Sequence, residues 1–300
     1  MEFKDWAGSC AEHFEKTAYY ALPLEQWQPW KLHEAMRYAV LDGGKRIRPL
    51  MVYAAGQLVR AEPEAMDHFA LAVEYLHSYS LVHDDMPCMD NDSLRRGKPT
   101  THRKFGEAMG MLAGDALQAQ AFAEVVKAKV PAEHAVAAVR LLASGAGSLG
   151  MCGGQGIDLL SVHSQLDLPM LTTMHRMKTG ALIRTSALMG LYAGQEKPQA
   201  QLLSLVTTWA EAVGLAFQVI DDILDVTADT ATLGKTAGKD AANDKPTFVS
   251  LLGIDKARAL AAEQAQTARQ ALQEIEALPG LEGKSLRLQQ ITDYIISRDH

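Results

Sequence analysis

Cysteine is scarce in this chain of 300 residues, which contains only Cys10, Cys88 and Cys152. An odd number of cysteines with no CxxC pair argues against a disulfide framework and against a zinc site built on thiolates. The fold must therefore depend on a hydrophobic core, which a chain of this length with 48% hydrophobic residues can bury. This cysteine usage also suits a reducing compartment such as the cytoplasm.

The chain also lacks a surplus of positive charge, since 29 lysines and arginines face 36 acidic residues for a formal net charge of -7. That balance disfavours a general nucleic-acid-binding protein, which needs a basic face. No stretch reaches the roughly 18 uninterrupted apolar residues of a membrane-spanning helix, and the N-terminus has no basic segment followed by an apolar one. We expect a soluble, untargeted cytoplasmic protein without membrane insertion.

Strand-like alternation is scarce, whereas apolar residues recur at spacings of three and four, as they do over residues 202–220. Glycine and proline separate these helical segments, for example at Gly43-Gly44, Pro63 and Pro131. No linker or repeat marks a boundary, so the pattern predicts one all-α domain over residues 1–300. The long loops 90–102 and 227–247 are expected to be functional lids.

Acidic side chains gather in the stretch HDDMPCMDND, which places four carboxylates between Asp84 and Asp92. Carboxylates this close repel one another and need a metal ion, an arginine or open solvent. An ideal helix would not point Asp84 and Asp90 the same way. Pro87 must end or distort the helix, which lets Asp90 return beside Asp84.

A second acidic cluster lies in FQVIDDILDV, where Asp221 and Asp225 share a helix face beside Asp222, and Gln218 precedes Asp221 by about one turn. Either cluster alone could be a solvated helix end. Together they suggest two walls of one cavity with metal between them. Magnesium fits, because it takes one or two carboxylates plus substrate phosphates, and the glycine and glutamate of a calcium-binding EF-hand loop are missing.

Basic residues alternate with these acidic clusters, an arrangement suited to a polyphosphate ligand. Nucleotide kinases are disfavoured, because neither GxxxxGK[ST] nor GxGxxG occurs. His77 lies two helical turns before Asp84 and is either part of a second phosphate site or a buried neutral histidine. Arg46, Lys98 and Lys239, each taken singly, are expected on solvated faces. The basic candidates are Lys45 and Arg48 after the glycine pair, Arg95 and Arg96 after the first acidic cluster, Lys178, and Lys235 and Lys245 after the second.

These segments resemble the trans-isoprenyl diphosphate synthases, most closely the bacterial farnesyl diphosphate synthases. The resemblance spans nearly the whole chain, and its motifs occur in family order. The interval from Asp84 to Asp90 is similar to the two-residue insertion of bacterial and plant members. The motifs are GGKRIRP (43–49), LVHDDMPCMDND with LRRGKPTTH (81–102), MCGGQGIDL (151–159), RMKTGALI (176–183), FQVIDDILDV (217–226) and the lysine-bearing loop that follows.

The resemblance implies an all-α fold around a deep central cavity, usually in a homodimer. It also implies a magnesium cofactor with three ions per active site, two held by the first aspartate-rich motif and one by the second. The implied ligands are Asp84 and Asp90 with Asp85 assisting, and Asp221 with Asp222 and Asp225 nearby.

Two diphosphate sites are implied by the same resemblance. Gln218 and the backbone carbonyl of Thr179 would face the developing cation, and Phe217 would lie along the isopentenyl tail. The allylic diphosphate would be held by Arg95, Lys178, Lys235 and Lys245, and isopentenyl diphosphate by Lys45, Arg48, His77 and Arg96.

Product length is expected to depend on Tyr79, which lies five residues before Asp84 and hence ~7.5 Å down the helix. A tyrosine ring at that depth can close a cavity floor, although an ordinary core tyrosine would look the same in sequence. The pair Tyr79-Ser80 is similar to the pattern of farnesyl-producing members.

The implied reaction is the head-to-tail condensation of dimethylallyl and geranyl diphosphates with isopentenyl diphosphate, which gives farnesyl diphosphate and diphosphate by a magnesium-assisted carbocation mechanism. Alternatives are a geranylgeranyl diphosphate synthase and a non-catalytic subunit of a heteromeric synthase, although such subunits usually lose part of an aspartate cluster. A class I terpene cyclase would bind a single diphosphate and would not need GGKRIRP.

Overall fold

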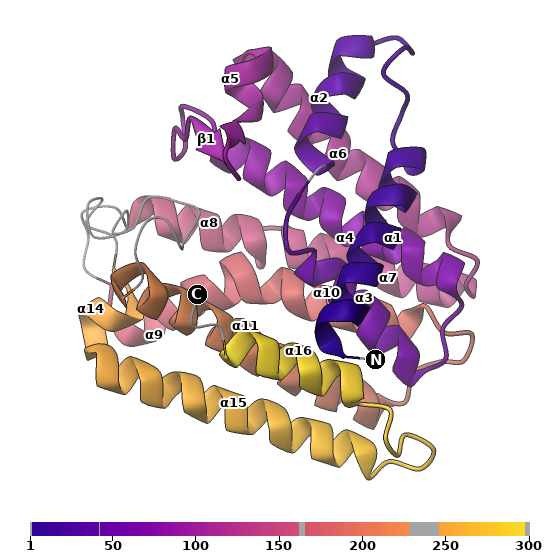
Figure 1. Cartoon of the computed structure of the whole chain (residues 1–300), viewed down its shortest axis with the longest axis vertical. Helices are drawn as coiled ribbons and strands as arrows, with labels where there is room; N and C mark the ends of the chain where they lie inside the picture. Colours follow the sequence, from indigo (N-terminus) through magenta and orange to yellow (C-terminus); the bar gives the residue numbers. More distant parts are fainter. Residues whose placement is uncertain (1, 42, 162–165, 228–245, 298–300) are drawn as a thin grey trace.

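The computed structural model describes residues 2–41, 43–161, 166–227 and 246–297 (Figure 1). Over these ranges the regular elements are helices apart from the short strands β1 (Leu94–Arg95) and β2 (Lys98–Pro99), which pair antiparallel. The all-α prediction is confirmed. The helices are α1 (Phe3–Ala21), α2 (Trp30–Val40), α3 (Ile47–Leu58), α4 (Pro63–Asp84), α5 (Thr101–Phe105), α6 (Glu107–Lys127), α7 (Ala132–Ala146), α8 (Met151–Leu160), α9 (Leu168–His175), the π-helical segment η1 (Arg176–Gly180), α10 (Ala181–Tyr192), α11 (Ala200–Thr227), α14 (Phe248–Leu252), α15 (Ile254–Glu276) and α16 (Leu286–Ile296).

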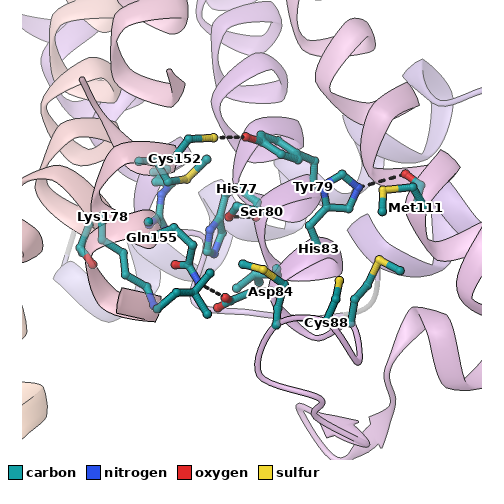
Figure 2. A pocket seen from close by; sticks show the side chains of 18 residues that line it. His77, Tyr79, Ser80, His83, Asp84, Cys88, Met111, Cys152, Gln155 and Lys178 are labelled. Carbon is teal, nitrogen blue, oxygen red and sulfur yellow. Dashed lines mark hydrogen bonds between the residues drawn. The ribbon is translucent and has the colours of Figure 1, made fainter. Parts of the chain in front are cut away.

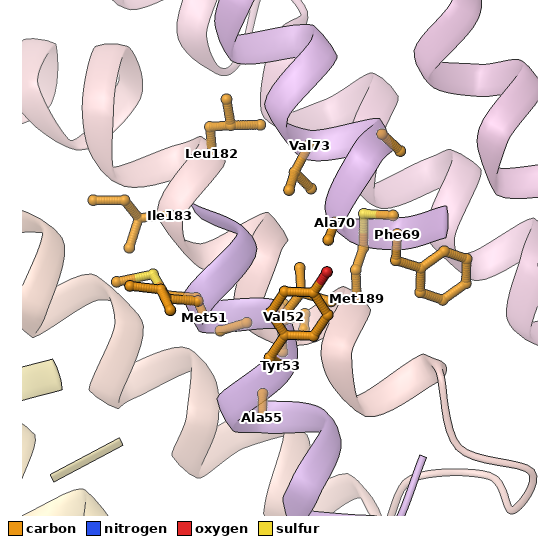
Figure 3. Close-up of a cluster of buried hydrophobic side chains, with 14 of the residues drawn as sticks. Met51, Val52, Tyr53, Ala55, Phe69, Ala70, Val73, Leu182, Ile183 and Met189 are labelled. Atoms are coloured by element: carbon orange, nitrogen blue, oxygen red, sulfur yellow. The ribbon is translucent and has the colours of Figure 1, made fainter. Parts of the chain in front are cut away.

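The main core lies where α3, α4 and α10 pack together (Figure 3). Met51 and Val52 of α3, Val73 of α4 and Met189 of α10 are fully buried. Nearly every residue of α3 from Pro49 to Gly56 is inaccessible, as expected for a helix that is apolar on all sides. This core fixes the position of α4, which ends in the first acidic cluster.

A second apolar cluster surrounds the C-terminal half of α11, which contributes Leu215 and Val219 to it. The N-terminal half of the same helix places Val206 and Trp209 in the main core, so α11 joins the two clusters. On α15, alanines recur along the buried face and allow close packing against α11. The second acidic cluster is thus carried by a helix that is fixed on several sides.

Two stretches, Ala132–Leu160 and Ala200–Thr227, are long and apolar enough by length and composition to cross a membrane. Core helices of soluble proteins meet the same criteria, and the window in the second stretch is 56% buried inside the protein. Because Trp209 and Val219 within it pack against other helices, we interpret α11 as a core helix.

Figure 1 shows the loop of β1, together with α8, α9 and α14, on one side of the molecule. The predicted loop 90–102 forms the short β1–β2 hairpin and the start of α5. Its fold is held by Thr100, whose Oγ1 donates to the carbonyl of Asp92 at 2.7 Å. Most of the second predicted loop, 227–247, lies outside the described residues.

Candidate functional site

A cavity of about 420 Å³ opens between α3, α4, α6, α8 and η1 (Figure 2). Its wall is rich in apolar and sulfur-containing side chains, including Met86, Met111 and Met151. Side chains of the first acidic cluster, the GGKRIRP motif and the RMKTGALI motif meet here. The predicted site residues that line the cavity are Arg48, His77, Tyr79, Ser80, Asp84, Lys178 and Thr179.

The first acidic cluster folds back on itself after α4 ends at Asp84. The backbone N–H of Asp90 donates to the carbonyl of Asp84 at 2.9 Å, and that of Asp92 donates to Asp85 at 3.1 Å. The prediction that Pro87 lets Asp90 return beside Asp84 is therefore confirmed for the backbone.

Asp84 is short of compensating positive charge. Burial raises its pKa to about 6, and the nearby Asp90 adds to this effect, while Lys178 and Arg95 oppose it. The side-chain amide of Gln155 on α8 donates to its Oδ1 (Figure 2). A divalent cation bound close to Asp84 would stabilise the charged carboxylate and would replace the proton there.

Asp85 and Arg95, which were predicted for metal and diphosphate binding, are partners of each other. The guanidinium Nε of Arg95 lies 2.9 and 2.8 Å from the two carboxylate oxygens of Asp85, and Nη2 lies 2.5 Å from Oδ1. Asp85 is only 2% exposed. This forked pair ties β1 to the end of α4, so Asp85 here fixes the loop.

Lys178 projects from η1 into the cavity, and its Nζ donates to Oδ2 of Asp158 at 2.6 Å. Asp158 is buried on α8 and stands one helical turn from Gln155, which bonds to Asp84. Neither Gln155 nor Asp158 is among the predicted site residues. The available signal was the motif MCGGQGIDL, because its glutamine and aspartate are three residues apart and share one face of a helix.

Thr179 links the second acidic cluster to the cavity. It lines the cavity beside Lys178. The Thr179 hydroxyl donates to Oε1 of Gln218 on α11 at 2.8 Å, and Asp221 follows Gln218 by about one turn. The π-helical turn of η1 changes the regular carbonyl pairing, which suits the predicted role of the Thr179 backbone carbonyl. Phe217 packs partly buried against the main core.

Asp222 and Asp225 are both buried but differ in their partners. Oδ2 of Asp222 accepts from the backbone N–H of Phe248 at 2.8 Å, at the first turn of α14. Oδ1 of Asp225 has no hydrogen-bond partner among the described residues. A buried carboxylate oxygen without a donor is costly unless a cation satisfies it.

Arg48 and His77 form a basic part of the cavity wall. Burial, followed by the nearby Arg48 and Arg96 guanidinium groups, holds the pKa of His77 well below its usual range. The Nε of Arg48 has no hydrogen-bond partner among the described residues. Guanidinium groups that lie near one another repel, so an anion between them would be stabilised.

The glycine pair that precedes these basic residues contacts the cation Arg96. The Gly43 carbonyl accepts from Nη1 of Arg96. Gly44 has φ +107, and a Cβ there would lie 2.6 Å from Nη2 of Arg96. A side chain at this position would have to push the Arg96 guanidinium aside. Lys45, beside the pair, is exposed.

The expectation that Arg46 lies on a solvated face is wrong. It is 2% exposed, and its Nη1 donates to Oε1 of Glu74 at 2.8 Å. Its guanidinium also bonds to Glu15 and to the carbonyl of Val40. Arg46 therefore holds α1, α2 and α4 together at the start of α3, while its neighbour Arg48 faces the cavity.

Among the described residues, no three acidic, histidine or cysteine side chains converge closely enough to cage a metal ion. This arrangement fits magnesium, which completes its octahedral shell with water and phosphate oxygens. The orphaned Asp225 oxygen and the undercompensated Asp84 are suitable donors. The predicted lysines Lys235 and Lys245, and also Lys239, lie outside the described residues.

Fold and site together define a class: an all-helical protein with an apolar cavity, bordered by carboxylates suited to divalent cations and by cations suited to anions. The family model "Polyprenyl synthetase" matches residues 29–279, and the chain belongs to this family of isoprenyl diphosphate synthases.

Curated relatives agree with this membership. A farnesyl diphosphate synthase of Haemophilus influenzae is 47% identical over 83% of both chains. That of Escherichia coli is 42% identical over 100% of both. A solved geranyltransferase of Helicobacter pylori, complexed with magnesium and isoprenyl diphosphate, superposes with a TM-score of 0.82 and 34% identity, covering 99% of this chain and 97% of that one.

Proposed function

We propose that the chain is a farnesyl diphosphate synthase, which joins dimethylallyl diphosphate and then geranyl diphosphate to isopentenyl diphosphate. The curated relatives that it matches over most of its length carry this name. The observation that carries the proposal is the cavity, which has Asp84 and Lys178 in one part and Tyr79, five residues earlier on α4, in another. Such a chamber accommodates an apolar chain below a diphosphate.

The basic side chains divide between two diphosphates. Arg48, His77 and Arg96, with Lys45, would hold isopentenyl diphosphate, because Nε of Arg48 has no hydrogen-bond partner among the described residues and the Arg48 and Arg96 guanidinium groups both lie near His77. Lys178 and Arg95, with Lys235 and Lys245, would hold the allylic diphosphate. Ion pairs with Asp158 and Asp85 hold Lys178 and Arg95 in place. These long cations would turn toward the diphosphate when it arrives.

Asp84, Asp90, Asp221 and Asp225 would hold magnesium, with three ions per site, while Asp85 and Asp222 mainly fix the loops next to them. When bound, magnesium neutralises charge on the departing diphosphate. The relative solved with magnesium supports the use of this metal.

Ionisation of the allylic carbon–oxygen bond would leave a carbocation, which the double bond of isopentenyl diphosphate attacks. The carbonyl of Thr179 and Oε1 of Gln218 would face this positive charge. Methionine-rich walls exclude water, which would otherwise trap the cation as an alcohol. The final proton would leave with the departed diphosphate, so no protein base is needed.

Product length would be limited by Tyr79, with Ser80 beside it, because both line the cavity on α4. We also propose that the chain acts as one domain, works in the cytoplasm and forms a homodimer. Exposed apolar side chains on α6 and α7 support the homodimer.

Incubation of the purified chain with dimethylallyl and isopentenyl diphosphates and magnesium tests the proposal. We expect chromatography of the dephosphorylated products to give mainly farnesol, and EDTA to abolish the reaction. Asp84→Ala should lower turnover by at least about 10²-fold, because the transition-state charge would lose its stabilisation.

Three other results would contradict this function. Geranylgeraniol as the main product would identify a synthase of longer chains. Absence of any condensation would indicate a non-catalytic subunit. Release of a hydrocarbon from a single allylic diphosphate would indicate a terpene cyclase.

A further inference from the structure

The hydroxyl of Tyr79 is tethered across the cavity to a cysteine. Tyr79 is 5% exposed, and its oxygen lies 3.1 Å from Sγ of Cys152 at the start of α8. Figure 2 shows the ring of Tyr79 extending from α4 to meet this thiol. The contact joins the helix that carries the first acidic cluster to the helix that carries Gln155 and Asp158.

Two further groups restrict the same ring. His83, one turn later on α4, meets it edge-on with ring centroids 5.5 Å apart. Nε2 of His83 bonds at 3.0 Å to the carbonyl of Met111 on α6, and Gln118 on α6 also hydrogen-bonds to Tyr79. His83 thus contacts the ring itself, whereas Cys152 from α8 and Gln118 from α6 meet its hydroxyl.

We infer that Cys152 is a positioning residue for product length, because its hydrogen bond holds the Tyr79 ring across the cavity as a closed floor. The inference rests on the proposed synthase function. Both residues line the cavity, so a ring released from Cys152 could swing aside and admit one more five-carbon unit. Bonds that involve sulfur are individually weak, so their loss changes the balance between products and leaves the reaction itself intact.

Substitutions at Cys152 distinguish the effect of the hydrogen bond on product length from the effect of cavity volume. Cys152→Ser keeps a partner for the Tyr79 hydroxyl and should keep the wild-type ratio of twenty- to fifteen-carbon products. Cys152→Val fills the space but cannot hydrogen-bond, and it should raise that ratio about threefold. Cys152→Ala should raise the ratio as well. If cavity size alone mattered, the valine variant would shorten the product and only the alanine variant would lengthen it.

Tyr79→Phe tests the other end of the same bond, because it removes the hydroxyl and keeps the ring. It also removes the bond to Gln118, so it should raise the product ratio at least as much as Cys152→Val does, and the double variant should not exceed Tyr79→Phe by much. Cys88→Ala is the matched control, since Cys88 lines the same cavity away from Tyr79 (Figure 2). It should leave the ratio unchanged.

The outcomes distinguish this inference from the proposed function. No prenyl product from the wild-type chain would contradict the function itself. Farnesyl product with equal ratios in the wild-type, Cys152→Val and Tyr79→Phe proteins would overturn the inference alone. It would also be overturned if Cys88→Ala lengthened the product as much as Cys152→Ala did.

Discussion

Neighbouring aspartates of one motif have different physical roles in this protein. Asp222 accepts a backbone hydrogen bond at the start of α14, whereas Asp225 has a buried oxygen with no partner among the described residues. The first arrangement stabilises the fold, and the second is costly unless a cation is bound. The same motif therefore combines a structural carboxylate with one that is suited to metal.

Alanine substitutions should separate these two roles. Asp222→Ala should lower the free energy of unfolding by about 0.5–2 kcal/mol, the usual cost of a lost helix cap. Asp225→Ala should not lower it, because a desolvated oxygen without a partner is removed. Urea unfolding without magnesium measures both. Asp222→Asn keeps an acceptor and is the control; equal losses of stability in the two alanine variants would contradict these roles.

The aspartates and arginines of the site differ in how much of their environment could be predicted from the sequence. The return of Asp90 beside Asp84 was predictable, because Pro87 has a local steric effect on the helix. The burial of Arg46 was not, since its partners Glu15 and Glu74 come from distant helices. The sequence indicates that Asp85 needs a positively charged partner. It does not indicate that this partner is Arg95, because their contact depends on how the β1–β2 hairpin folds.

At the scale of elements, the site depends on how closely α8 packs against η1. Gly154 lies on the buried face of α8, and a Cβ there would come within 2.2 Å of the backbone nitrogen of Lys178. The helical periodicity of both segments could be predicted from the sequence. Their contact could not, because a glycine in a helix gives no indication of which backbone approaches it.

Gly154→Ala should therefore move Lys178 and Thr179 together. The clash is with backbone atoms, so no side-chain rotation relieves it, and a displacement of about 1 Å at reacting groups can cost roughly 10²-fold in rate. We expect kcat/KM to fall by about 10–100-fold with helical content retained in circular dichroism.

Gly8→Ala on the exposed side of α1 is the matched control for this substitution. No atom lies within 4 Å of its added Cβ, so kcat/KM should be unchanged and stability should rise slightly. Unchanged kinetics in Gly154→Ala would show that the contact between α8 and η1 does not position Lys178.

At the scale of the whole molecule, apolar side chains remain exposed on helices outside the cavity. Leu112 and Val126 are 49% and 71% exposed and lie about four turns apart on the same side of α6. Val136 on α7 and Leu149 in the turn after it are 63% and 87% exposed. Because α6 and α7 contact each other, these residues suit a surface that is covered by a second copy.

Light scattering should therefore give twice the chain mass of 32.6 kDa. Val126→Glu would place a charge in the apolar contact and should shift the mass toward the monomer at micromolar concentration, because burial of an unpaired carboxylate is costly. Tyr20→Glu makes a similar change at an exposed ring on α1 and should leave the mass unchanged. A monomeric wild-type chain with full activity would contradict the homodimer, whereas a dimeric Val126→Glu protein would place the contact on another face.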